Sequence, residues 1–127
     1  MKYQQFFICK HCGNTVGLIH NGSAPLICCG EHMEELVPNT VDASVEKHVP
    51  QAEYKEGIVN VRVGSVDHPM IKEHYIEWVY IQTDKGGQRK ALKPGDQPAV
   101  TFAVIDDTPK AVFAYCNLHG LWLAEMS

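Results

Sequence analysis

Apolar and polar residues alternate along much of the second half of the chain. The segment VNVRVGSV at 59–66 has valine at three alternate positions, with asparagine and arginine between them. A period of two is typical of a β-strand with one buried face. Further segments rich in aromatic and β-branched residues indicate strands as well: YIEWVYIQT (75–83), AVTFAVI (99–105), AVFAYC (111–116) and GLWLAE (120–125). The pattern therefore predicts a series of short strands over these ranges.

Turn-forming residues separate the predicted strands. The connecting segments are DKGGQ, KPGDQP and DDTP, in which glycine, proline and aspartate favour tight reversals of the backbone. No stretch carries an apolar stripe at helical spacing. Short strands joined by glycine and proline turns favour an antiparallel sandwich or barrel, and we predict an all-β fold.

The cysteines divide the chain into two parts. Four of the five cysteines lie in the first 29 residues, as CKHC and CC, and a proline-containing connector, VPNTVDAS, follows at 37–44. A segment this short buries too little apolar surface to fold unaided, so a bound metal would supply much of its stability. We predict a small metal-nucleated domain at residues 1–36 and a larger β domain at 37–127.

Composition and charge limit the kinds of partner that the chain is expected to bind. The chain has 127 residues, of which 45% are hydrophobic and 20% are charged, and its formal net charge is −4 without a basic cluster. These values argue against nucleic acid as a partner. We see no apolar run long enough to cross a membrane and no signal peptide, and we expect a cytoplasmic location. In a reducing compartment, cysteines are more often ligands or nucleophiles than disulfides.

The N-terminal cysteines have the spacing of a metal site. Four thiolates around one ion suit zinc or a single iron, and the candidate ligands are Cys9, Cys12, Cys28 and Cys29. Glycine follows each pair and lets the backbone turn so that amides point at the sulfurs. Because side chains of adjacent residues diverge, the pair at 28 and 29 predicts a distorted geometry. The spacing leaves zinc and iron open.

A second group of candidate ligands lies in the larger domain. HPMIKEH contains His68 and His74, EKHVP contains His48, and CNLHG contains Cys116 and His119. Pro69 follows His68 and Pro50 lies just beyond His48, so we expect both histidines to project from extended backbone. The residues leave three readings open: a mononuclear site of four histidines and one cysteine, a catalytic cysteine–histidine pair, and a copper site of two histidines and one cysteine.

Seven motifs give the chain a resemblance to a known family over essentially its whole length. They are CKHCGN, ICCGE, EKHVP, GSVDHPM, HYIEW, LKPGD and YCNLHG. In this order and spacing, the chain resembles desulfoferrodoxin, the two-iron form of superoxide reductase. The resemblance implies a desulforedoxin-like knuckle domain at 1–36 and an immunoglobulin-like antiparallel β-sandwich at 37–127.

The resemblance also implies two iron ions and their ligands. The first iron would bind the four N-terminal cysteines. The catalytic iron would bind four histidines in a plane and one axial cysteine: His48, His68, His74, His119 and Cys116. Glu46 and Lys47 match a loop beside the open sixth position, where Lys47 would attract superoxide and Glu46 would occupy the position after peroxide leaves. The implied reaction reduces superoxide to hydrogen peroxide without releasing oxygen.

The resemblance further implies an electron donor such as rubredoxin or a flavoprotein reductase, and a homodimer. One position departs from the pattern, because Leu123 stands where we expect a basic residue. Two rival functions remain at this point: a rubredoxin-like electron carrier without catalytic activity, and a zinc-stabilised binding module.

Overall fold

The computed structural model describes residues 2–126 and contains two compact units, Met1–Val37 and Pro38–Ser127. The first unit is built from short strands. A three-stranded antiparallel sheet has the order β2-β1-β5, and a two-stranded hairpin joins β3 to β4. The bounds are β1 Gln5–Ile8, β2 Thr15–Leu18, β3 Ile27–Cys28, β4 Glu31–His32 and β5 Glu34–Glu35.

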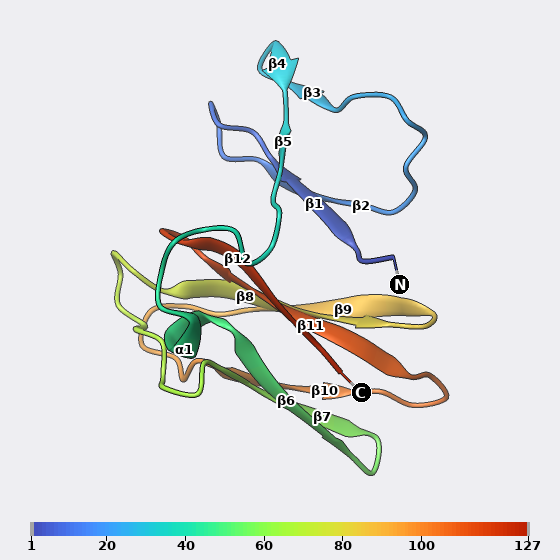
Figure 1. The fold of residues 1–127 in the computed structure, drawn as a ribbon, viewed down its shortest axis with the longest axis vertical. Coiled ribbons are helices and arrows are strands. Elements are labelled where there is room, and N and C mark those ends of the chain that lie inside the picture. The colour runs from blue at the N-terminus through green and yellow to red at the C-terminus, as the bar shows by residue number, and fades with distance from the viewer. Residues whose placement is uncertain (1, 127) are drawn as a thin grey trace. The chain divides into compact units, whose positions relative to one another are not determined.

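The second unit contains seven strands in two sheets, with one helical turn before them (Figure 1). The sheet orders are β10-β7-β6 and β12-β11-β8-β9, and every pairing is antiparallel. The bounds are α1 Val45–His48, β6 Pro50–Lys55, β7 Ile58–Val63, β8 Ile76–Thr83, β9 Gly86–Ala91, β10 Ala99–Ala103, β11 Pro109–Cys116 and β12 Gly120–Glu125.

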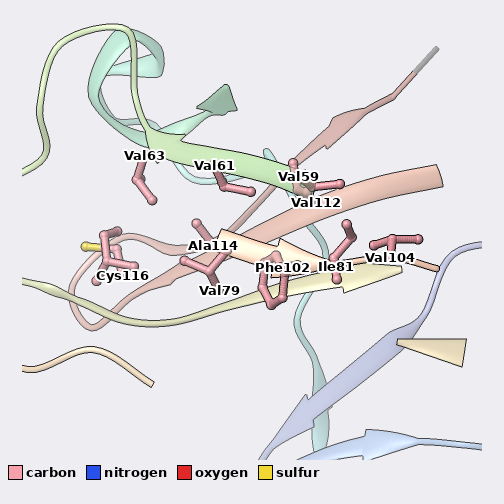
Figure 2. Close-up of a cluster of buried hydrophobic side chains, with 11 residues drawn as sticks. Val59, Val61, Val63, Val79, Ile81, Phe102, Val104, Val112, Ala114 and Cys116 are labelled. Carbon is pink, nitrogen blue, oxygen red and sulfur yellow. The ribbon is translucent and has the colours of Figure 1, made fainter. Parts of the chain in front are cut away.

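The core lies between the two sheets of this unit. Strand β7 is alternately exposed and buried, and its three valines, Val59, Val61 and Val63, point inward. They belong to one buried cluster with side chains of the facing sheet, including those of β8 and β11. Figure 2 shows this cluster, with Cys116 at the same end as Val63. Burial of apolar surface at about 25 cal/mol per Å² therefore favours the register that leaves Cys116 at the end of the core.

Side chains of β9 cover the neighbouring edge of the other sheet. Gln88 Nε2 donates to the Ala103 carbonyl at 2.7 Å, and Lys90 Nζ donates to the Thr101 carbonyl. Both carbonyls belong to β10, the edge strand of the three-stranded sheet. Unpaired carbonyls on an edge strand attract other chains, so these bonds protect the edge as well as linking the sheets.

The structure confirms the all-β prediction and corrects it locally. The five predicted strand segments all contain strands, but β6, β9 and the five short strands of the first unit were missed. All six residues of β9 are exposed, so β9 carries no alternating pattern to detect. The helical turn α1 was also missed, and no helix in residues 2–126 has the length and apolar character needed to span a bilayer.

The expected extended backbone at His48 is wrong. His48 is the last residue of α1, and the residue restrained by Pro50 is Val49, which has φ −70° and ψ 119°. Proline restricts the residue directly before it. Its effect therefore ends the helical turn one residue after His48.

Candidate metal centres

The four N-terminal cysteines lie close enough to share one ion. Their sulfur atoms all lie within 4.8 Å of one another, and the Sγ atoms of Cys12 and Cys28 are 3.6 Å apart. Two sulfurs about 2.3 Å from a tetrahedral ion would be about 3.8 Å apart. The strand order of the first unit thus brings both cysteine pairs to one site of the size expected for a tetrahedrally bound ion.

The backbone around these sulfurs turns as the glycines predict. Gly13 and Gly30 have φ of +81° and +76°, in the region that glycine adopts without strain. Cys29 also has a positive φ, 53°, which is uncommon for a residue with a side chain. This conformation of Cys29 lets two adjacent cysteines direct their sulfurs to the same site.

Hydrogen bonds and sulfur crowding give the four thiols unequal acidity. Backbone N–H groups, that of Cys12 foremost, lower the pKa of Cys9 to about 6. The neighbouring sulfurs of Cys12, Cys9 and Cys28 raise the pKa of Cys29 to about 12. Four thiolates at this separation repel one another, so full ionisation requires a cation among them.

The five candidate ligands of the second unit come from four separate segments at one end of the sandwich. His48 ends α1, and His68 lies in the loop after β7. His74 forms an isolated bridge with Ile71 just before β8. Cys116 ends β11, and His119 lies in the turn to β12. Antiparallel pairing of the strands brings these distant segments together.

The four imidazole rings form a square. Successive ring centroids are 4.6 Å apart for His48–His68, 4.7 Å for His68–His74, 5.1 Å for His74–His119 and 4.9 Å for His119–His48. The diagonal His48–His74 is longer, at 6.3 Å. Neighbouring rings are nearly perpendicular, at 76° to 85°. The rings thus surround one central point edge to face.

The histidine nitrogen atoms that point into the site each carry a free lone pair. Nδ1 of His48 lies 2.6 Å from the Ser44 carbonyl, and Nδ1 of His68 lies 2.7 Å from the Pro69 carbonyl. A carbonyl only accepts, so each Nδ1 carries the proton and each Nε2 carries a lone pair. Yet the two Nε2 atoms face each other at 3.1 Å. Two such nitrogens bound at right angles to one ion, at about 2.1 Å, would be about 3.0 Å apart.

His74, His119 and Cys116 complete this site. Nε2 of His74 is buried and has no hydrogen-bond partner among the described residues. His119 presents Nδ1, which lies 3.1 Å from Nε2 of His48 and 3.9 Å from Sγ of Cys116. Sγ of Cys116 lies within 4.8 Å of the ligand nitrogens of the other three histidines. A buried, unpaired nitrogen and facing lone pairs are the features expected of a metal site.

Burial favours the uncharged form of three of the histidines and of the cysteine in this site. It lowers the pKa of His68 to about 4, and it also lowers the pKa of His48 and of His74. Neutral imidazoles at neutral pH have a free lone pair for a metal. Burial raises the pKa of the Cys116 thiol, so a bound cation would have to favour the thiolate.

Two supports of the site were not predicted from the sequence. The Trp122 ring stacks on His48 with centroids 4.9 Å apart, and its Nε1–H donates to the His119 carbonyl at 3.0 Å. Gly95, in the LKPGD motif, donates its N–H to the Met70 carbonyl at 2.8 Å. The LKPGD turn therefore holds the loop between His68 and His74, a role that its sequence did not indicate.

Glu46 and Lys47 lie in the exposed helical turn that ends at His48. The positive charge of Lys47 contributes to the lowered pKa of both His48 and His74, which places its field at the site. The Glu46 carbonyl accepts from the Val66 N–H at 3.0 Å. Gly64 packs on this turn: a Cβ there would lie 2.6 Å from the Glu46 carbonyl oxygen. A residue without a side chain at 64 therefore fixes the approach of the turn.

The geometry favours one of the three readings left open by the sequence. All four histidines surround the site, whereas a cysteine–histidine pair or a two-histidine copper site would use fewer. Leu123 is on β12, opposite Phe113, and its backbone bonds to the Asn39 side chain. None of these contacts involves a ligand of either site.

Comparisons with known proteins agree with both sites. Residues 2–36 match the family "Desulfoferrodoxin, N-terminal domain", and residues 40–125 match "Desulfoferrodoxin". A desulfoferrodoxin homolog from Archaeoglobus fulgidus is 48% identical over 118 residues, which is 93% of this chain and 94% of that protein. A desulfoferrodoxin from Syntrophotalea carbinolica is 45% identical over 121 residues, covering 95% of each chain.

A solved structure has a similar fold over nearly the whole chain. The crystal structure of the superoxide reductase from Treponema pallidum superposes with a TM-score of 0.82 at 39% identity, covering 97% of this chain and 99% of that chain. The four-sulfur and the histidine–cysteine groups of this chain fit two iron centres. On these grounds the chain belongs to the desulfoferrodoxin family.

Proposed function

We propose that the chain is a superoxide reductase with a four-sulfur iron centre in its first unit. The observation that carries the proposal is the square of four imidazole rings with the Cys116 sulfur beside it. Solved relatives are described as superoxide reductases. The reaction combines superoxide with one electron and two protons to give hydrogen peroxide, and it releases no oxygen.

The ligand assignment follows from the donor atoms. Cys9, Cys12, Cys28 and Cys29 hold the first iron, within an N-terminal domain at 1–36. Within the domain at 37–127, the second iron is held by His48, His68, His74, His119 and Cys116. When bound, this second iron supplies the electron for superoxide and an open coordination position. The ligand set contains one thiolate and four neutral imidazoles, so a divalent ion retains one positive charge that attracts an anion.

Lys47 and Glu46 act at the open position in this proposal. Lys47 is exposed, and its positive charge is felt at His48 and His74. It draws superoxide toward the site despite the net charge of −4, because a nearby charge dominates a dispersed one. The ammonium group also supplies a proton, directly or through water. Glu46, one residue earlier, carries carboxylate oxygens that would serve as a further ligand to the iron when no substrate is bound.

We assign the electron supply to rubredoxin or a flavoprotein reductase. Exposed apolar side chains on the first unit, Ile19 foremost at 99% exposed, support a homodimer. All five cysteines are free, which supports a reducing, cytoplasmic location.

A metal count combined with superoxide decay tests the proposal. The purified chain should contain two irons and consume pulse-generated superoxide while an oxygen electrode records no oxygen release. One iron, with superoxide unaffected, would favour the rubredoxin-like electron carrier. A colourless zinc protein would favour the binding module. Oxygen release in step with superoxide loss would indicate dismutation and would contradict the assignment.

Lys47→Ala should slow the reaction with superoxide by about tenfold and weaken its dependence on ionic strength. Removing the charge removes its attraction for the anion, and that attraction is the part of the rate that salt screens. Pulse radiolysis at several salt concentrations measures both effects. Lys55→Ala is the matched control, because Lys55 is exposed at the other end of β6 from α1. Equal rates and salt slopes in the two variants would remove Lys47 from the mechanism.

A further inference from the structure

His74 differs from two other ligands of the site in how its ring is held. The Nδ1 atoms of His48 and His68 are bonded to backbone carbonyls, which fix both rings. In residues 2–126, no such bond holds the ring of His74, and its Nε2 has no partner. A metal-bound histidine usually depends on a hydrogen bond from its other nitrogen for its orientation. The orientation of His74 therefore depends on its backbone and on the rings of His68 and His119 that pack beside it.

The Asn117 side chain holds that backbone on both sides of His74. Its Oδ1 accepts from the Tyr75 N–H at 3.0 Å, and its Nδ2 donates to the Glu73 carbonyl at 3.0 Å. The Asn117 N–H also donates to the Tyr75 carbonyl, at 3.2 Å. Asn117 thus bonds to the residue before His74 and to the residue after it.

Only a short amide suits this position. One side-chain atom must accept from an N–H while the other donates to a carbonyl, and this pairing fixes which atom of Asn117 is oxygen. Aspartate keeps the length but loses the donor. Alanine loses both bonds. In addition, Asn117 directly follows Cys116 and precedes His119 by two residues. Its bonds therefore join the turn with two candidate ligands to the segment with a third.

We infer that Asn117 is a positioning residue for the second centre, which sets the direction of His74 relative to Cys116 and His119. Its catalytic consequence rests on the proposed function. Its consequence for metal binding rests only on the geometry of the site. A small rotation of the His74 backbone would move Nε2 away from the central point of the square, and the bond between this nitrogen and the metal would weaken.

Asn117→Ala and Asn117→Asp in the full, iron-loaded chain test this inference. We expect the affinity of the second centre for iron to fall about 10- to 100-fold, the range typical when a residue that orients a ligand is lost. The thiolate-to-iron absorption and the reduction potential of this centre should also shift. Chelator competition, visible spectroscopy and a redox titration measure the three effects. The first centre of the same chain should keep its potential and serves as an internal reference.

Asn60→Ala is the matched control. Asn60 is exposed on β7, where its side chain accepts from the Thr101 hydroxyl at 2.9 Å. Should Asn117→Ala fail to fold, Asn117→Asp decides the question, because it retains the volume and the bond from Tyr75. Affinity, absorption and potential equal to those of Asn60→Ala would overturn the inference. A wild-type chain that binds iron but does not reduce superoxide would defeat the proposed function and leave these three measurements valid.

Discussion

Cys116→Ala should abolish superoxide reduction and remove the thiolate-to-iron absorption of the second centre. Cys116 is the only cysteine in the second unit, and its sulfur is buried among the inward-pointing histidine nitrogens. Alanine offers no donor atom, so the site would lose both the negative charge and the soft, electron-donating sulfur that Cys116 would supply to the iron. In the proposed ligand set Cys116 binds the iron directly, so the expected loss of rate is about 100-fold or more, beyond the roughly 10- to 100-fold typical of losing a residue that only orients a ligand.

Stopped-flow kinetics and visible spectroscopy measure this loss, and Cys116→Ser supplies the comparison. Serine keeps nearly the same shape at the end of the buried cluster, so it separates the loss of the sulfur from the loss of packing. Thermal unfolding of both variants reports on the sandwich itself. If Cys116→Ala retained both the absorption and the activity, the assignment of this sulfur as an iron ligand would be wrong.

Cys12→Ser should remove the first iron and leave superoxide reduction largely intact. Cys12 is exposed, and its sulfur lies 3.6 Å from that of Cys28 in the four-sulfur group. A hydroxyl is a poor substitute for a thiolate, so the site would lose a quarter of its donors. The ion supplies much of the stability of so small a unit, so the first unit should also unfold. The second unit has its own core and its own ligands.

Metal analysis should show one iron per chain in this variant, and pulse radiolysis should show a rate close to that of the wild type. Hydrogen exchange, read by mass spectrometry, would locate the loss of protection within residues 2–37. A variant that lost all activity while retaining the second iron would show that the first iron is required for turnover. Retention of both irons would remove Cys12 from the ligand set.

The fold was predictable wherever one face of a strand is buried. The alternating valines of β7 follow directly from this rule. Strands β8 and β11 are buried at most positions, and their aromatic and β-branched residues predicted them instead. Strand β9 has no buried face, and its Gly86 and Gly87 read as a turn. The turn α1 has only four residues, which is too short for any helical periodicity to appear.

The cysteines of the first site could be found from spacing alone, since a Cys-x-x-Cys pair and a second pair lie close together in the sequence. The histidines of the second site have no common spacing. The sequence grouped four of the seven histidines with Cys116 in the larger domain but left three readings of the site open, and the family resemblance was needed to choose among them. The roles of Asn117 and Trp122 could not be predicted from the sequence, because they depend on strand register. The pairing of β11 with β8 brings Asn117 beside Tyr75, and no local pattern encodes that contact.

The separation of ligands along the chain sets the order in which the two centres can assemble. Cys12 and Cys28 are 16 residues apart, whereas His48 and His119 are 71 residues apart. Closing a short loop costs less entropy than closing a long one, and an ion can close the first site from a nearly unstructured chain. The second site can form only after the strands have paired. We therefore expect iron loading of the first site to require only a short local segment, and iron loading of the second site to require the paired strands of the sandwich.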